Sequence, residues 1–219
     1  MTSRLNLVIL GIQGAGKGTQ CKRLSATYGI PHVSTGDILR AAIKDKTPLG
    51  REVEGILAEG GLVSDDLVNR LVEERFTQPD AQKGALLDGF PRTIGQAEAL
   101  DAILGDDGIK LCINLDAPIE LVTDRLSRRR VCQECGHIYH DADESAISGK
   151  CEKCGGPVIQ RADDTADSIR QRLSLYERDT APLLHYYEER GLLVTLNADQ
   201  SVDAVTAEIE KVLAERGLV

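Results

Sequence analysis

A glycine-rich segment near the start of the chain has the residue types and spacing of a phosphate-binding loop. Gly11, Gly16 and Lys17 match the pattern G-x-x-x-x-G-K, and the apolar run Leu5–Leu10 leads into it. In such a loop, backbone N–H groups and the start of the next helix bind phosphate oxygens, while the lysine adds a positive charge. The segment predicts binding of a nucleoside triphosphate, and a glycine-rich turn without a ligand is the alternative.

Phosphate-binding loops usually carry a Ser or Thr hydroxyl and work with an acidic residue near Mg²⁺, and this sequence has a candidate for each. Gly18 stands where the general pattern has Ser or Thr, and the hydroxyl follows one residue later at Thr19. Asp88 ends the apolar run that begins at Ala85, and an acid in that place can orient the water shell of Mg²⁺. A strand-end Asp that caps a turn is the alternative.

Four of the six cysteines form two Cys-x-x-Cys pairs, namely Cys132, Cys135, Cys151 and Cys154. This spacing predicts a tetrahedral zinc site, with disulfides or free thiols as the alternatives. Four thiolates close the coordination sphere, so the predicted role is structural, and His137 and His140 are not expected to be ligands. The acidic residues around the pairs disfavour nucleic-acid binding.

Arginines gather on both sides of the cysteine pairs, at Arg125, Arg128, Arg129, Arg130, Arg161, Arg170 and Arg172. A run of charge is usually a solvated face, and this interpretation suits Arg128, Arg130 and Arg170. The whole chain has a formal net charge of −9, so any polyanionic ligand must bind where positive charge is concentrated locally. We therefore expect no binding to nucleic acid or to an anionic membrane surface.

Apolar runs and helical periodicities alternate along the chain, which indicates an α/β fold with a parallel sheet. The predicted strands are Leu5–Leu10, His32–Ser34, Ala85–Asp88, Lys110–Leu115 and Leu192–Leu196. The predicted helices are Thr19–Tyr28, Asp37–Lys44, Arg51–Glu59, Asp65–Phe76, Ile94–Leu104, Pro118–Arg129, Ala166–Glu189 and Val202–Arg216, with Ser64 as a cap. Residues 131–164 interrupt this rhythm and are expected to form an insertion with its own small core.

The 219 residues, 42% of them apolar, suffice for one large domain with small inserted lobes. No stretch approaches the roughly 18 to 20 continuous apolar residues of a membrane span, and no cleavable signal precedes the first strand. A cytoplasmic location is expected. A monomer is expected too, because no long apolar surface run stands out.

Three motifs in order carry a resemblance to a known family. The phosphate-loop segment Gly14–Gln20 is followed by Ser34–Arg40 and then by Asp88–Thr93 with Gln96. Together they resemble the adenylate kinase family of nucleoside monophosphate kinases, in which Gly18-Thr19 is the usual form. Gln13 departs from the family, where most members have Pro, and a slightly looser loop is expected.

The resemblance covers essentially the whole chain and implies a P-loop three-layer fold with a five-stranded parallel sheet flanked by helices. The core would be residues 1–34, 64–130 and 165–219. Residues 35–63 would form an AMP-binding lobe, and residues 131–164 a zinc-binding lid. The implied activity is reversible, Mg²⁺-dependent transfer of the terminal phosphoryl group of ATP to AMP, giving two ADP. Alternatives are another acceptor such as UMP or CMP, GTP as donor, or a non-catalytic binding module.

The resemblance also implies roles for individual residues. AMP would be held by Thr35, Arg40, Gly61, Leu62, Val63, Gly89, Phe90, Pro91, Arg92, Gln96, Arg161 and Arg172. ATP would be held by Gly14, Ala15, Gly16, Lys17, Gly18, Thr19, Arg125, Arg129, Ile138, Tyr139 and Gln200. The catalytic residues would be Lys17, Arg92, Arg129, Arg161 and Arg172, with Asp88 on the Mg²⁺ water shell. Gln96 would read the adenine edge, and Arg125 would stack on the donor base.

Overall fold

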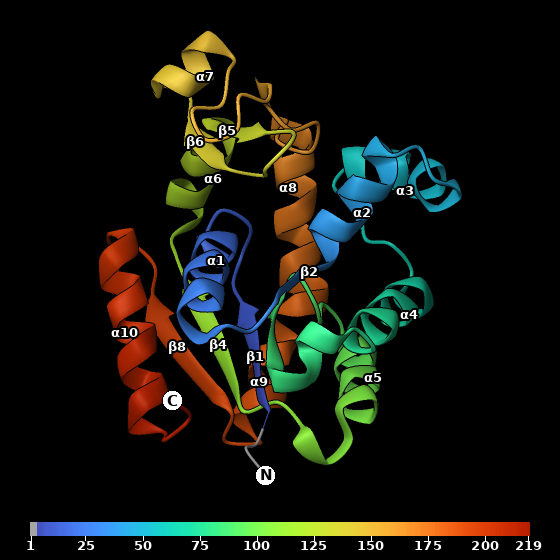
Figure 1. Cartoon of the computed structure of the whole chain (residues 1–219), viewed down its shortest axis with the longest axis vertical. Coiled ribbons are helices and arrows are strands. Elements are labelled where there is room, and N and C mark those ends of the chain that lie inside the picture. Colours follow the sequence, from blue (N-terminus) through green and yellow to red (C-terminus); the bar gives the residue numbers. More distant parts are fainter. Residues whose placement is uncertain (1–3) are drawn as a thin grey trace.

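The computed structural model describes residues 4–219, and its centre is a parallel sheet of five strands in the order β2-β3-β1-β4-β8 (Figure 1). The strands are β1 (Leu5–Leu10), β2 (His32–Ser34), β3 (Gly84–Asp88), β4 (Leu111–Asp116) and β8 (Leu193–Asn197). All four neighbouring pairs are parallel. The predicted α/β fold with a five-stranded parallel sheet is therefore confirmed.

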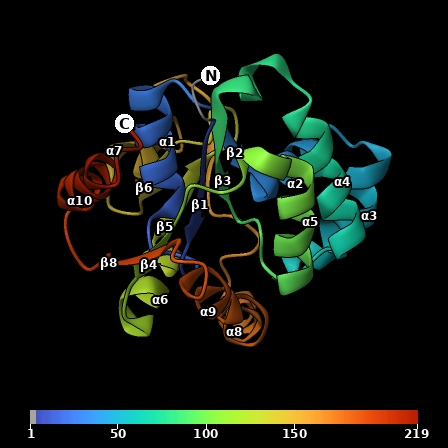
Figure 2. The same ribbon diagram turned by 90° about the horizontal axis from the view of Figure 1, so that it is seen from below.

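Successive side chains of the buried strands point to opposite faces, and each face carries its own apolar core. In β1, Val8 and Leu10 pack into one core, while Leu7 and Ile9 pack into the other. The first core includes side chains of α4 (Asp65–Phe76), α5 (Ile94–Leu104) and α9 (Pro182–Glu188); the second includes those of α1 (Lys17–Tyr28) and α10 (Val202–Glu215). Figure 2 shows α1 and α10 on the opposite side of the sheet from α5, which gives three layers.

The remaining core elements are α6 (Ile119–Ser127), α8 (Ala166–Leu175) and the short 3₁₀ helices η1 (Pro79–Lys83) and η2 (Gly105–Asp107). The helical periodicity predicted over Ala166–Glu189 is confirmed, but it belongs to two α-helices rather than to one. A π-helical turn, Tyr176–Thr180, follows α8, and α9 then begins at Pro182. Because proline has no N–H to donate within a helix, the regular hydrogen bonding cannot run through this point.

Two further local predictions are confirmed only in part. Ser64 occupies the N-cap position of α4, but its side chain makes no capping hydrogen bond. The helix predicted over Pro118–Arg129 ends at Ser127, and Arg129 opens a strand of a separate sheet. Helices α4 and α5 have the predicted bounds. The other helices differ from the prediction by one to three residues at one or both ends, because helix ends are set by local capping.

Two helices, α2 (Thr35–Lys44) and α3 (Pro48–Ala58), form a hairpin beside the sheet. The Ser34 side chain caps α2 by accepting a hydrogen bond from the backbone of Asp37, and Thr47 caps α3 in the same way. The two helices meet closely at Gly50, where an added Cβ would lie 2.0 Å from the Ala42 carbonyl oxygen. Among residues 4–219, no helix combines the length and the apolar character that crossing a membrane requires.

The insertion, residues 131–164, folds on its own small core. Strand β5 (Arg129–Cys132) pairs antiparallel with β6 (Ile138–His140) and β7 (Val158–Ile159), and the short helix α7 (Glu144–Ser148) follows β6. Cys132, Tyr139, Cys151 and Val158 form the buried cluster, which confirms the predicted separate core. Figure 1 shows this unit above the carboxyl ends of the central strands, next to the hairpin of α2 and α3.

Candidate active site

The glycine-rich loop joins β1 to α1 in a conformation that depends on its glycines. Gly11 has φ 136°, and a Cβ there would lie 2.5 Å from the Leu115 carbonyl oxygen. Gly16 has φ 102° and stands at the N-terminus of α1. The Lys17 ammonium donates to the carbonyl oxygens of Gly11 at 2.6 Å and Ile12 at 3.0 Å. Desolvation, only partly offset by Asp88, lowers the pKa of Lys17 to about 8.

Asp88 lies at the carboxyl end of β3, next to the start of α1. Its Oδ2 is 3.2 Å from Nε2 of His32, and a Cβ added at Gly18 would lie 3.3 Å from the same oxygen. A side chain at position 18 would press on the carboxylate, which favours glycine there. Burial alone would raise the pKa of Asp88, but the His32 hydrogen bond and the Lys17 charge outweigh burial and lower it.

A large cleft extends from the loop to the insertion. All the residues expected to hold ATP line it: Gly14, Ala15, Gly16, Lys17, Gly18, Thr19, Arg125, Arg129, Ile138, Tyr139 and Gln200. The Arg125 guanidinium donates to the Ala198 carbonyl at 3.3 Å. The Ile138 side chain is exposed. Tyr139 borders the cleft, but its side chain is buried and its hydroxyl lies 3.1 Å from Cys151 Sγ.

A smaller pocket adjoins the cleft, beneath α2 and α3. Ten residues expected to hold AMP line it: Thr35, Arg40, Gly61, Leu62, Val63, Gly89, Arg92, Gln96, Arg161 and Arg172. Phe90 does not, because it is fully buried in the core, and Pro91 lines the large cleft instead. Thr35 donates to the Gly89 carbonyl at 2.9 Å, and the Arg92 Nε donates to the same oxygen at 2.8 Å.

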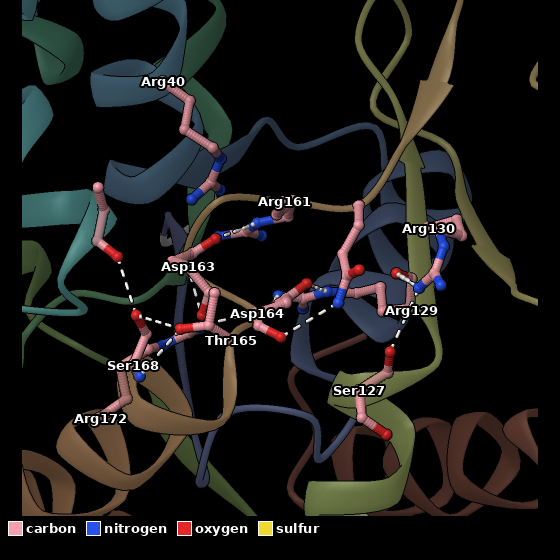
Figure 3. A network of polar contacts seen from close by, with 12 residues as sticks. Arg40, Ser127, Arg129, Arg130, Arg161, Asp163, Asp164, Thr165, Ser168 and Arg172 are labelled. Atoms are coloured by element: carbon pink, nitrogen blue, oxygen red, sulfur yellow. Dashed lines mark hydrogen bonds and ion pairs between the residues drawn. The ribbon is translucent and has the colours of Figure 1, made fainter.

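The arginines at the junction of the two cavities are held by two aspartates (Figure 3). Arg129 binds Asp164 through two hydrogen bonds of 2.8 and 2.5 Å, and Arg161 binds Asp163 with the same two distances. Arg172 contacts both carboxylates, at 3.1 and 3.3 Å. The Asp164 side chain has no exposed surface. Three guanidinium groups share two carboxylates, which leaves a local excess of positive charge for anionic ligands.

Burial and charge act in opposite directions on this network. Burial would raise the pKa of Asp163, but the hydrogen bonds and charge of Arg161 outweigh it and hold that pKa well below its usual range. Burial lowers the pKa of Arg172 to about 10, so its guanidinium stays charged near neutral pH. Arg128 and Arg170, by contrast, are exposed and pair with Asp141 and Asp167, which fits their interpretation as solvated surface.

Comparison with known proteins decides the family. The family model described as adenylate kinase matches residues 9–192. An adenylate kinase of Moorella thermoacetica is 47% identical over 212 residues, covering 95% of this chain and 98% of its own. One from Thermodesulfovibrio yellowstonii is 45% identical over 215 residues, covering 97% of this chain and all of its own. The chain belongs to the adenylate kinase family.

The four cysteines of the insertion come together. All four sulfur atoms lie within 4.8 Å of one another, with Cys132–Cys154 at 3.5 Å and Cys135–Cys151 at 3.6 Å. A disulfide would need about 2.05 Å, whereas four thiolates at about 2.3 Å from a tetrahedral ion lie about 3.8 Å apart. Gly136 and Gly155, one after each pair, have φ 64° and 75°, as tight turns require. The donor set and spacing fit zinc.

Some side chains that support the two cavities have no sequence signal. Asp65 contacts Gln96, while Asp163 and Asp164 hold the arginines; none of the three lies in a recognisable motif. Lys44 of α2 pairs with Glu134 of the insertion at 2.8 Å, and thereby joins two segments far apart in the sequence. Such partners depend on tertiary contacts, which spacing along the chain does not report.

Proposed function

We propose that this chain catalyses reversible phosphoryl transfer between ATP and AMP, with ATP in the large cleft and AMP in the smaller pocket. The observation that carries this proposal is the wall shared by the two cavities. Arg40, Arg92, Arg161 and Arg172 line both. Two phosphate chains that enter from opposite sides would therefore meet at the same guanidinium groups, whose planar forks match phosphate oxygens.

The proposed mechanism needs no side-chain nucleophile. An oxygen of the AMP phosphate attacks the γ-phosphorus of ATP in line, and ADP leaves on the opposite side. Lys17, Arg92, Arg129, Arg161 and Arg172 neutralise charge on the transferring group. Asp163 and Asp164 hold three of these arginines before the reaction begins, which reduces the reorganisation required at the transition state.

Asp88 and Thr19 supply the oxygen donors that Mg²⁺ prefers, at the end of the loop that would hold the phosphates. Gly18 has no side chain, so no Cβ crowds the carboxylate oxygen that would face the water shell of the ion. When bound with ATP, Mg²⁺ would neutralise phosphate charge. Asp88 would orient its water molecules, because the lowered pKa keeps this carboxylate ionised at neutral pH.

The insertion is the proposed lid over ATP, with zinc in a structural role. Its buried core has only a few side chains, so it gains little stability from apolar burial. Zinc held by Cys132, Cys135, Cys151 and Cys154 would supply the missing stabilisation. Thiolate ligation also suits a reducing compartment, in line with the expected cytoplasmic location. The monomeric state remains a prediction.

An acceptor and donor panel tests the proposed function. ADP formation would be measured with ATP or GTP as donor and with AMP, UMP, CMP or GMP as acceptor. We expect the highest kcat/KM for ATP with AMP, and almost no ATP hydrolysis when no acceptor is present. A higher kcat/KM with UMP or CMP would contradict the assignment of the smaller pocket to AMP.

A further inference from the structure

The side-chain amide of Gln96 is held from two sides at the wall of the smaller pocket. Gln96 is 3% exposed and lies among apolar residues that include Leu39 and Val68. The backbone N–H of Arg92 donates to Gln96 Oε1 at 2.7 Å. Gln96 Nε2 donates to Asp65 Oδ1, also at 2.7 Å. Both ends of the amide are therefore engaged by groups of the protein itself.

These two partners allow only one orientation of the amide. The backbone N–H can only donate, and an ionised carboxylate can only accept. Rotating the Gln96 amide by 180° would set its NH₂ against the Arg92 N–H and its oxygen against Asp65. Two favourable contacts would thus become two repulsive ones.

The carboxylate of Asp65 is itself fixed by Thr93. The Thr93 hydroxyl donates to Asp65 Oδ2 at 2.6 Å and accepts from the backbone N–H of Gln96 at 3.1 Å. Residues at the starts of α4 and α5 therefore form a closed ring of hydrogen bonds. Asp65 links the two helices at the point where Gln96 faces the pocket.

The held amide keeps one N–H on Nε2 and one lone pair on Oε1 free for a ligand. Adenine presents its N6 amino donor beside the N1 acceptor, which matches a free acceptor beside a free donor. Hypoxanthine in the same position presents the O6 acceptor beside the N1–H donor, so both contacts become repulsive. With a freely rotating amide, hypoxanthine would bind after a simple flip.

We propose that Asp65 is a positioning residue that makes the acceptor site select a 6-amino purine over a 6-oxo purine. It does so by preventing the flip of the Gln96 amide. The inference rests on the proposed function, with AMP in the smaller pocket, and on the role that the family resemblance implies for Gln96, which is to read the acceptor base. It adds a residue outside the three sequence motifs and assigns base selectivity to a pair of side chains rather than to Gln96 alone.

The test compares Asp65→Asn with Asp66→Asn, using AMP and IMP as acceptors at fixed ATP. Asp66 is the matched control, because it is the next residue in the first turn of α4 but is exposed. An asparagine at position 65 can either donate or accept, so it removes the repulsion between a flipped Gln96 amide and position 65 and leaves the Arg92 N–H as the remaining contact that opposes the flip. IMP has the hypoxanthine edge without the 2-amino group of GMP, which removes the question of added bulk.

In Asp65→Asn we expect the ratio of kcat/KM for AMP to kcat/KM for IMP to fall by about tenfold, the usual effect of one hydrogen bond to a charged group. The KM for ATP should not change, and Asp66→Asn should keep the unmodified ratio. A ratio in Asp65→Asn equal to that of the unmodified enzyme would overturn the proposal, as would an equal loss with both acceptors. If Asp65→Asn does not fold, Asp65→Ala carries the same expectation.

A third variant separates this proposal from the function it rests on. Gln96→Ala should abolish most of the discrimination between AMP and IMP. If Gln96→Ala keeps the original ratio, Gln96 does not read the base and that part of the proposed function fails. If Gln96→Ala loses the ratio while Asp65→Asn keeps it, only the positioning role of Asp65 fails.

Discussion

At the scale of single residues, the arginines depend on buried carboxylates that hold them. Asp164 has no exposed side-chain surface and pairs with Arg129 and Arg172, whose side chains are each 13% exposed. Removing one partner of a buried ion pair leaves the other charges uncompensated. The same carboxylate therefore stabilises the fold and keeps two of the proposed phosphate-binding groups in place.

Asp164→Asn should lower the free energy of unfolding by about 3 kcal/mol, because it removes the charge that two buried guanidinium groups share. Urea denaturation measures this change. The control is Asp167→Asn, since Asp167 is 90% exposed and pairs with the exposed Arg170; there the change should be within about 0.5 kcal/mol. Equal stability of the two variants would show that the Asp164 pair contributes little.

Lys17 gives the free enzyme a dependence on pH. Desolvation lowers the pKa of Lys17 to about 8, so the ammonium becomes a neutral amine as the pH rises above that value. We expect kcat/KM for ATP to fall about tenfold per pH unit in the alkaline limb, because only the charged form attracts the phosphates. Lys17→Arg should remove this limb, since arginine stays protonated. A flat profile to pH 10 in the unmodified enzyme would contradict the prediction.

At the scale of elements, the insertion has a small apolar core, and its four cysteines are the proposed main source of its order. Its core contains Cys132, Tyr139, Cys151 and Val158, with Ala146 packed against them. Glu134 lies between two of the cysteines and pairs with Lys44 of α2, while the Lys22 ammonium of α1 donates to the Gly136 carbonyl at 2.7 Å. Any loss of order in this unit would also remove its contacts with both helices.

Removal of zinc by a strong chelator should lower the melting temperature and raise the KM for ATP, because the lid would lose its main source of order. The KM for AMP should change less, since only Arg161 and Asp163 of the insertion line the smaller pocket. Readdition of zinc should restore both quantities. An unchanged melting temperature after verified metal loss would rule out a structural role for the ion.

At the scale of the whole molecule, the sequence predicted the layered architecture because buried parallel strands leave unmistakable apolar runs. Leu5–Leu10 and Ala85–Asp88 were predicted almost residue for residue. The break between α8 and α9 was missed, because helical periodicity continues through Tyr176–Thr180 although the hydrogen bonding changes there. The strand that begins at Arg129 was missed too, since its pairing partners lie in the insertion.

Some residues of the candidate site could be predicted from local sequence patterns, and others could not. Glycine spacing, the Asp88–Thr93 segment and the cysteine pairs are local patterns, and each predicted residues that the structure brings to the two cavities or to the cysteine cluster. The aspartates that hold Gln96 and the arginines have no local pattern. Their roles depend on which helices and strands contact one another in the folded chain. These tertiary contacts cannot be inferred from residue spacing in a single sequence.

The arginines that line both cavities are proposed to stabilise the phosphoryl group during transfer. Arg92 lines both cavities, whereas Arg170 is 70% exposed and pairs with Asp167. The most direct measurement is kcat for ADP formation from ATP and AMP in Arg92→Ala and Arg170→Ala, with folding verified by thermal unfolding. We predict a loss of about a hundredfold or more in Arg92→Ala and a change within about twofold in Arg170→Ala. Near-normal turnover in a folded Arg92→Ala enzyme would contradict the proposal that the arginines lining both cavities stabilise the transferring phosphoryl group.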